Sequence, residues 1–172
     1  VDVDKIDSQG GSIRCFICHK NTSEKVSKKI KFVINSEKKL GLYSAIKLKK
    51  FKSQIISHIK KLRRLLLDLK RKQKRISIYG ASGKGQALMQ FCNIDNKIVD
   101  YVFDKSKLKQ GLFTPGTQIK IKNSNDIKKT NIHYLLLLSW NLKKEIIKQE
   151  KNFIKNGGKF IIPFPSPKIL KK

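Results

Sequence analysis

A glycine-rich turn between a short apolar run and a helical pattern offers the clearest chemistry in this chain. The run is Ile76-Ser-Ile-Tyr79, and the turn is Gly80-Ala-Ser-Gly-Lys-Gly85. Glycines let a backbone approach a phosphate closely, the first amides of a helix point toward it, and Lys84 adds a positive charge. This layout is typical of the first strand, turn and helix of a doubly wound α/β unit and indicates a nucleotide or nucleotide-sugar ligand. The candidate binding residues are Gly80, Ala81, Ser82, Gly83, Lys84 and Gly85.

The turn departs from the two best-known phosphate-binding motifs. It is not a Walker A loop, because Gly83-Lys84 is followed by Gly85 and not by Ser or Thr. It is not the dinucleotide fingerprint G-x-G-x-x-G either, because Ser82 replaces the middle glycine. A tight strand-to-helix turn without a ligand therefore stays open as the alternative.

Further polar residues are expected along the same edge of the sheet. Asp104 ends the predicted second strand, where dinucleotide-binding folds place an acidic residue for a ribose hydroxyl. Ser139 and Asn141 follow a later apolar strand and would face the same crevice. In the simpler interpretation Asp104 caps a turn, Asn141 caps a helix and Trp140 only packs.

The segment Cys15-Phe-Ile-Cys18-His19 matches the spacing of covalent haem attachment. We expect neither haem nor metal here, because residues three apart in a strand point to opposite faces and the remaining Cys and His are scattered. Cys15 and Cys18 are interpreted as half-buried strand cysteines in a reducing compartment. No Ser/His/Asp set or carboxylate pair is visible, so the sequence indicates binding and not catalysis.

The net charge of +28 comes mainly from lysine, and the lysines are spread over the whole chain. We interpret this excess as the coding bias of an AT-rich genome, because readout of DNA bases favours arginine. Its field would still attract anionic ligands. No apolar run is long enough to cross a bilayer and no signal peptide is visible, so we expect a cytoplasmic protein that binds neither nucleic acid nor membrane.

The first half of the chain is predicted to hold few elements. Residues 1–18 should form two short strands around Gly10-Gly11, and residues 19–35 a loop. A seam of apolar residues spaced by three or four predicts one long amphipathic helix over residues 40–73. That helix should pack on its own domain or a neighbouring one, with a homodimer as the alternative. The seam consists of Leu48, Phe51, Ile55, Ile59, Leu62, Leu66 and Leu69.

The remaining residues alternate between strand and helix patterns. Repeated β-α units imply a mostly parallel sheet between helical layers. The predicted fold is therefore α/β, three-layer and Rossmann-like, preceded by a short β arm and the long amphipathic helix. Strands are expected at 75–79, 98–103, 118–121, 133–138 and 159–163, and helices at 85–92, 124–129 and 141–156, with Asn141 as the cap of the last helix and a Pro-rich tail after 163.

Taken in order, several segments resemble the C-terminal domain of sugar C-methyltransferases. The resemblance covers nearly the whole chain and rests on Gly10-Gly-Ser-Ile-Arg14, Ile78–Gly85, Asp104–Gly111, Thr114–Thr117, Leu138–Asn141 and Gly157–Pro163. It implies a zinc-binding N-terminal domain and a central S-adenosylmethionine-binding domain upstream of a Rossmann-like domain. It also implies methylation of a carbon beside a keto group in a dTDP-linked deoxysugar, which the C-terminal domain helps to hold against the central domain.

The resemblance also implies how the chain divides. Residues 1–35 would join an upstream methyltransferase domain through Gly10, Gly11, Ser12 and Arg14, and residues 36–172 would form the Rossmann-like domain. Zinc and S-adenosylmethionine are implied only for the upstream domains, and the family's Tyr-x-Glu-His base segment would lie just before Val1. Gln9 stands where the family has His.

Three functions follow from these observations, of which the third, a basic nucleic-acid-binding protein, is disfavoured by the few arginines and the lack of an aromatic platform. The first is a nucleotide-sugar-binding C-terminal domain of a sugar C-methyltransferase, with no cofactor or metal in this chain. The second is a stand-alone, non-catalytic Rossmann-like binding or scaffold module. Whether the chain is an enzyme is left open, because no residue set in it can deprotonate a carbon or hold a methyl donor.

Overall fold

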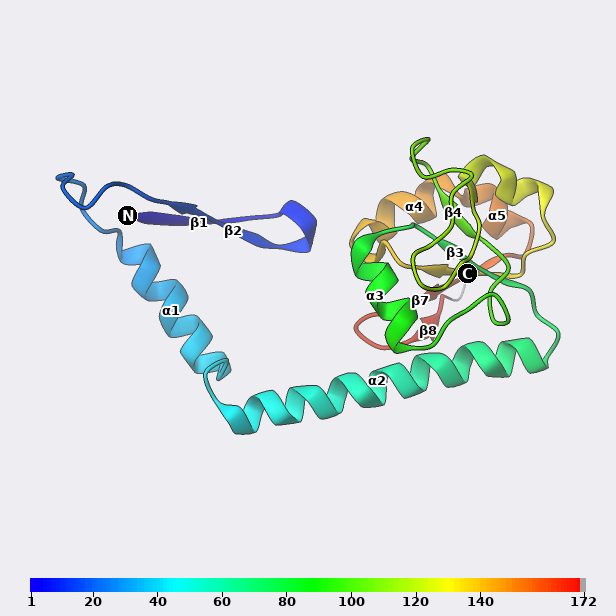
Figure 1. Cartoon of the computed structure of the whole chain (residues 1–172), viewed down its shortest axis with the longest axis horizontal. Coiled ribbons are helices and arrows are strands. Elements are labelled where there is room, and N and C mark those ends of the chain that lie inside the picture. The colour runs from blue at the N-terminus through cyan, green and yellow to red at the C-terminus, as the bar shows by residue number, and fades with distance from the viewer. Residues whose placement is uncertain (171–172) are drawn as a thin grey trace. The chain divides into compact units, whose positions relative to one another are not determined.

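In the computed structural model, which describes residues 1–170, the chain forms two compact units (Figure 1). They are Val1–Gln54 and Ile55–Lys172, and helix α2 (Ala45–Arg71) runs across the boundary between them. The functional division at residues 35 and 36 stays a prediction.

The first unit contains the expected hairpin. Strands β1 (Asp2–Ile6) and β2 (Ser12–Phe16) pair antiparallel, with Val3 opposite Cys15. A single 3-10 turn, η1 (Ser8–Gly10), connects them. Gly10 and Gly11 both have positive φ, which suits glycine at a reversal of the chain.

The expected loop over residues 19–35 is wrong in its second half, where helix α1 (Lys28–Leu40) begins. The Ser27 hydroxyl caps it by accepting a hydrogen bond from the Lys29 amide at 3.2 Å. Lys29 also pairs with Asp2 and Asp4 of β1 at 3.1 and 2.8 Å. Five lysines and one glutamate hid the helical pattern in the sequence, because they leave only a narrow apolar stripe.

The predicted long helix over 40–73 is shorter than expected at its start. Gly41, with φ of 75°, ends α1 by donating its amide to the Glu37 and Lys38 carbonyls, and α2 begins only at Ala45. The seam on α2 is buried at Leu62, Leu66 and Leu69, whereas its N-terminal part is exposed.

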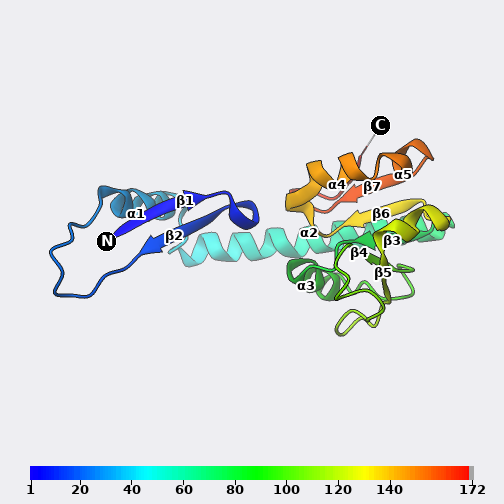
Figure 2. The same ribbon diagram turned by 90° about the horizontal axis from the view of Figure 1, so that it is seen from above.

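The second unit is built on a six-stranded sheet in the order β5-β4-β3-β6-β7-β8. Five strands are parallel, β8 pairs antiparallel with β7, and helices cover both faces, which confirms the mostly parallel, three-layer α/β fold. Figure 2 shows strands β5 to β7 side by side. The strands are β3 (Ile76–Tyr79), β4 (Val102–Asp104), β5 (Ile121–Asn123), β6 (Tyr134–Leu137), β7 (Lys159–Ile162) and β8 (Lys168–Ile169).

Several boundaries differ from the expected ones. Strand β4 begins at Val102 and not at residue 98, because Ile98 and Val99 pack into the core from the turn before it. Strand β5 begins at Ile121 and not at residue 118, where Gln118 has a positive φ that breaks the extended run. Strand β8 was not expected, because the Pro-rich tail does not show an alternating pattern.

One helical layer consists of α2 and α3 (Gly83–Phe91), and the other of η2 (Ser124–Lys129), α4 (Lys143–Gln149) and α5 (Lys151–Lys155) (Figure 1). The prediction of a single helix over 141–156 is wrong. The segment begins with a 3-10 turn, η3 (Trp140–Leu142), and the helical part that follows is broken at Glu150 into α4 and α5. Asn141 lies inside η3 and does not cap α4, whose cap position is Leu142.

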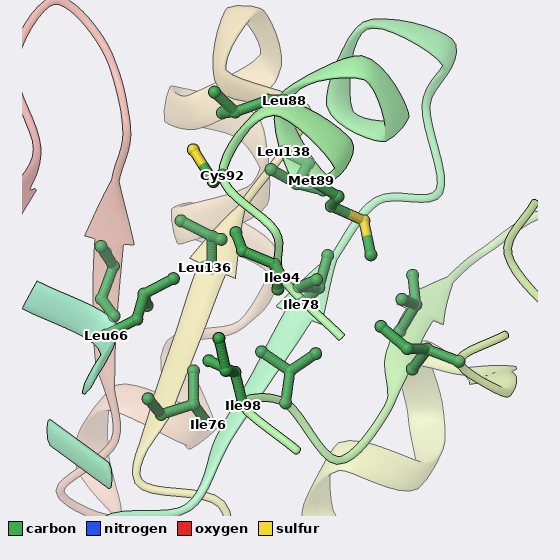
Figure 3. Close-up of a cluster of buried hydrophobic side chains, with 14 of the residues drawn as sticks. Leu66, Ile76, Ile78, Leu88, Met89, Cys92, Ile94, Ile98, Leu136 and Leu138 are labelled. Atoms are coloured by element: carbon green, nitrogen blue, oxygen red, sulfur yellow. The ribbon is translucent and has the colours of Figure 1, made fainter. Parts of the chain in front are cut away.

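The core between the sheet and the α2–α3 layer is shown in Figure 3. Ile76 and Ile78 of β3, Leu136 of β6 and Leu66 of α2 lie in one cluster, and all four are fully buried. Strand β3 is buried on both of its faces, as expected for the centre of a parallel sheet. Arg63 adds a polar tie from α2 to the residues after α3, by donating to the Cys92 carbonyl at 2.8 Å.

Replacing Leu66 by Ala should lower the free energy of unfolding by about 2–5 kcal/mol, because a fully buried leucine leaves a cavity when it is shortened. Leu48→Ala, on the exposed part of the same helix, is the matched control and should change it by less than about 0.5 kcal/mol. Urea denaturation measures both. Equal losses would contradict the burial of only one half of the seam.

Candidate functional site

The glycine turn lies where the sequence predicts it, between the carboxyl end of β3 and the start of α3. Ser82 is the helix cap: its hydroxyl accepts from the Gly85 amide at 3.1 Å and donates to the Leu138 carbonyl at 3.3 Å. The cap therefore joins the turn to the end of β6, the neighbouring strand. Because β3, β4 and β6 are parallel, their carboxyl ends lie at the same edge of the sheet. Open α/β sheets bind ligands at this edge.

Two of the three glycines in the turn are required by packing. At Gly80, with φ of 96°, an added Cβ would stand 2.2 Å from Ser139 Oγ. At Gly85 it would stand 2.6 Å from Leu138 Cβ. Gly83 is different, because a Cβ there would meet nothing within 4 Å and its φ is not positive. Neither the fold nor the backbone conformation requires glycine at Gly83.

Asp104 is mostly buried and holds the turn in place. One of its carboxylate oxygens accepts from the Ala81 amide at 2.7 Å, and the other accepts from the Ser106 amide at 2.8 Å. Lys109 donates to the Ala81 carbonyl at 2.9 Å and lies 3.6 Å from the Asp104 carboxylate. The Ala81 amide is therefore committed to Asp104. A ribose-binding role for Asp104 stays a prediction.

The other sequence-predicted residues lie at different places. Ser139 is in contact range of Gly80, so the structure brings it to the turn. Asn141 is exposed in η3, just after the end of β6. The expected junction residues lie in the first unit: Gly10, Gly11, Ser12 and Arg14 belong to the hairpin turn and to β2.

Sequence reasoning missed the loop that supports the turn from the side. Gln86, in the first turn of α3, donates to the Pro115 carbonyl at 2.6 Å and to the Thr117 hydroxyl at 3.3 Å. Together with Lys109, these contacts hold the long loop after β4 against the start of α3. The segments Asp104–Gly111 and Thr114–Thr117 were noted only for their resemblance to a family. Nothing in the sequence predicts that a lysine or a threonine in them contacts a turn about 25 to 30 residues away.

Trp140 packs within an aromatic cluster at the same edge. Its ring lies 4.7 Å from the Phe164 ring, and Phe164 stacks on His58 of α2 at 4.4 Å. This favours the packing interpretation of Trp140. The Nε2 atom of His58 is buried without a hydrogen-bond partner in residues 1–170, and burial, together with the charge of Lys61, lowers the pKa of His58.

A separate polar groove of about 700 Å³ lies between η2 and the α4–α5 pair, with Ser124, Glu150 and His133 among its lining residues. Near it Tyr79 donates to the Glu150 carboxylate at 3.0 Å. Burial and that carboxylate raise the pKa of Tyr79, so the phenol stays protonated at neutral pH. Nothing in this pair suggests a proton-transfer role.

The described residues contain no group of three or more Cys, His, Asp or Glu that could hold a metal ion. The expectation of two half-buried strand cysteines holds only in part. Cys15 lies on β2 but is exposed, whereas Cys18 is half-buried but lies beyond the end of that strand, which stops at Phe16. Among residues 1–170, none of the helices combines the length and apolar character that a bilayer crossing requires.

Replacing Gly80 by Ala should destabilise the protein by about 1–3 kcal/mol, because alanine would be strained at φ of 96° and crowded against Ser139. Gly83→Ala is the matched control. It should leave the unfolding free energy unchanged or raise it slightly, because the position is helical and open. Thermal or urea unfolding of the two variants measures both effects. A larger loss of unfolding free energy for Gly83→Ala than for Gly80→Ala would contradict the packing role of Gly80.

The His58 cluster predicts a pH dependence. The folded-state pKa of His58 lies below the ordinary value of 6.5, so the unfolded chain binds its proton more readily. The stability that this histidine contributes is therefore present above pH 6.5 and lost as the pH falls through the lower, folded-state pKa. We expect His58→Phe, which keeps the ring stack, to lose less unfolding free energy than the wild type between pH 7 and pH 5. Denaturation at the two pH values measures these losses. An equal loss of unfolding free energy in the wild type and in His58→Phe would contradict a role for His58.

Comparison with known proteins identifies the family of the chain. A family model for the C-methyltransferase C-terminal domain matches residues 7–165. The C-methyltransferase NovU of Streptomyces niveus is 31% identical over 170 residues, which cover 99% of this chain and 40% of NovU, so the chain spans less than half the length of that relative. A solved structure, UDP-D-quinovosamine 4-dehydrogenase from Vibrio fischeri, aligns with a TM-score of 0.42 and 20% identity over 57% of this chain and 93% of the dehydrogenase. With the family model covering almost its whole length, the chain belongs to the C-methyltransferase C-terminal domain family.

Proposed function

We propose that this chain is the substrate-side domain of an S-adenosylmethionine-dependent sugar C-methyltransferase and that it binds a dTDP-linked keto-deoxysugar. The observation that carries this proposal is Gly83, the one glycine of the turn that neither packing nor φ explains. It lies in the first turn of α3, at the carboxyl edge of a parallel sheet, where a pyrophosphate is favoured by helix amides and by the helix dipole. Membership of the C-methyltransferase family supports it further.

The proposed binding mode uses residues with different tasks. The diphosphate approaches from the side of Gly83, and Lys84 contributes positive charge next to it. The Ala81 and Gly85 amides do not contact the ligand, because they are bonded to Asp104 and Ser82. Asp104, Lys109 and Ser82 hold the turn in a fixed shape before the ligand arrives, which reduces the entropic cost of binding.

Methyl transfer to a carbon requires a base to remove a proton beside the carbonyl and a methyl sulfonium to be attacked. S-adenosylmethionine supplies that methyl group in such enzymes. The residues described here show one glycine-rich strand-to-helix turn, which we assign to the nucleotide sugar, so they offer no separate fit for the methyl donor. In this proposal the chain binds and orients the substrate, and a methyltransferase domain joined through Gly10, Gly11, Ser12 and Arg14 performs the chemistry.

The alternative function is a non-catalytic scaffold. It is favoured by the same network around Asp104, which satisfies the Ala81 amide without any ligand. In that case the turn is a structural corner, and Gly83 has no binding role.

Isothermal titration calorimetry with dTDP-glucose separates the two functions. Gly83→Ala and Lys84→Ala should each weaken binding about tenfold or more, which corresponds to about 1.4 kcal/mol, while the melting temperature stays close to that of the wild type. Lys97→Ala, an exposed lysine in the turn before β4, is the matched control for the loss of one positive charge and should bind as the wild type does. Equal affinities for wild type, Gly83→Ala and Lys84→Ala would remove the proposed site, and a wild-type chain that binds no nucleotide sugar would favour the scaffold.

A further inference from the structure

The polar groove between η2 and the α4–α5 pair is a second candidate ligand site, separate from the glycine turn. Its volume of about 700 Å³ lies within the range of roughly 300–1,000 Å³ that is typical of small-molecule sites. None of residues 80–85 lines it, and all of its lining residues belong to the second unit. Of the fifteen residues within 1–170 that line it, eleven have polar side chains, so a ligand would be held mainly by hydrogen bonds.

A carboxylate with one unused oxygen lies in this groove. Glu150 occupies the break between α4 and α5, and its Oε1 accepts from the Tyr79 hydroxyl at 3.0 Å. Tyr79 is almost fully buried, whereas Glu150 is half-buried. Within residues 1–170, Glu150 Oε2 accepts no hydrogen bond, and no lysine or arginine forms an ion pair with the carboxylate. Tyr79 therefore fixes the carboxylate in place, while its second oxygen stays available to a ligand that donates a hydrogen bond.

Other lining residues supply hydrogen-bond donors. His133 Nδ1 accepts from the Arg75 amide at 3.0 Å, so a neutral His133 ring carries its proton on Nε2, which is then a donor. The carboxamides of Asn131 and Asn152 are exposed and form no hydrogen bond within residues 1–170, so each keeps both a donor and an acceptor. Together with Glu150, these groups fit a ligand that donates and accepts hydrogen bonds.

The charges of the groove favour a neutral ligand over an ionic one. Lys105 and Lys128 line the groove and oppose a cation, whereas the Glu150 carboxylate opposes an anion. A hydroxyl group is compatible with both charges, because it accepts from an ammonium group and donates to a carboxylate. Phe153 adds an apolar wall, against which the C–H face of a ring can pack. The lining therefore matches a neutral ring that carries several hydroxyl groups.

We propose that this groove binds a neutral sugar. Glu150 Oε2 accepts from one sugar hydroxyl, and Asn131, Asn152 and His133 donate to others. A sugar fits because each of its hydroxyls both donates and accepts, and because its ring also has apolar faces. The proposal uses no residue of the glycine turn, so it and the binding of a nucleotide sugar at that turn can fail separately.

NMR titrations of the full chain with D-glucose, maltose and dTDP test the proposal, because ¹H–¹⁵N spectra resolve backbone and side-chain amides separately. At least one of the two sugars, at millimolar concentrations, should cause saturable shifts at the side-chain amides of Asn131 and Asn152 and at the backbone amide of Glu150. The same sugar should leave the amides of Gly83 and Lys84 unchanged. Titration with dTDP should shift none of the groove amides.

Two variants test whether the sugar contacts the groove residues. Asn152→Ala removes an exposed carboxamide, and Glu150→Gln keeps an oxygen for Tyr79 but removes the negative charge. Each should raise the dissociation constant of the sugar about fivefold or more, as the loss of one hydrogen bond does, while far-UV circular dichroism stays unchanged. Asn96→Ala, an exposed asparagine before β4 that does not line the groove, is the matched control and should bind as the wild type does.

Three results would overturn the proposal. The first is the absence of saturable shifts in the groove with both sugars. The second is unchanged sugar affinity in both Asn152→Ala and Glu150→Gln. The third is a shift of the groove amides by dTDP that is as large as the shift by the sugars, because the groove would then be an anion site.

Discussion

The turn that joins β3 to α3 has no room for a side chain at Gly80 or at Gly85, and the rest of the site depends on this packing constraint. Gly80 lies against Ser139, and Gly85 lies against Leu138, so the turn and the end of β6 can approach only because both residues lack a Cβ. This approach brings the start of α3 to the centre of the carboxyl edge. It also lets Ser82 donate to the Leu138 carbonyl, which ties the helix cap to the sheet.

Around this corner, hydrogen bonds from distant parts of the second unit hold the turn in a fixed shape. Asp104 and Lys109 fix the turn through hydrogen bonds to Ala81, and Gln86 holds the following loop against α3. The first unit differs, because Val3 is its one buried hydrophobic residue and many of its large apolar side chains are exposed. In the proposed function, the fixed turn of the second unit holds the anionic ligand, and a methyltransferase domain performs the chemistry.

The parts of the structure that follow from local patterns could be predicted from the sequence. The apolar run before Gly80, the alternation of strand and helix, and the hairpin around Gly10-Gly11 each carry their own signal. Helix α1 was missed, because its lysines conceal a narrow apolar stripe, and the break at Glu150 was missed because the apolar spacing runs through it. The partners of Asp104 and Lys109 could not be predicted, since they are distant in sequence and depend on how the loop after β4 folds back. Likewise, the seam on α2 has one spacing throughout, and only the tertiary structure shows that its N-terminal part is exposed.

The central claim is that the open first turn of α3 receives the diphosphate of a nucleotide sugar. Two-dimensional ¹H–¹⁵N NMR spectra of the chain during a titration with dTDP test it most directly, because each amide reports separately. The account predicts the largest saturable shifts at the amides of Gly83 and Lys84, with small shifts at Ala81, whose amide is already bonded to Asp104. Spectra without saturable shifts, or with the main shifts in the polar groove between η2 and α4–α5, would contradict the claim.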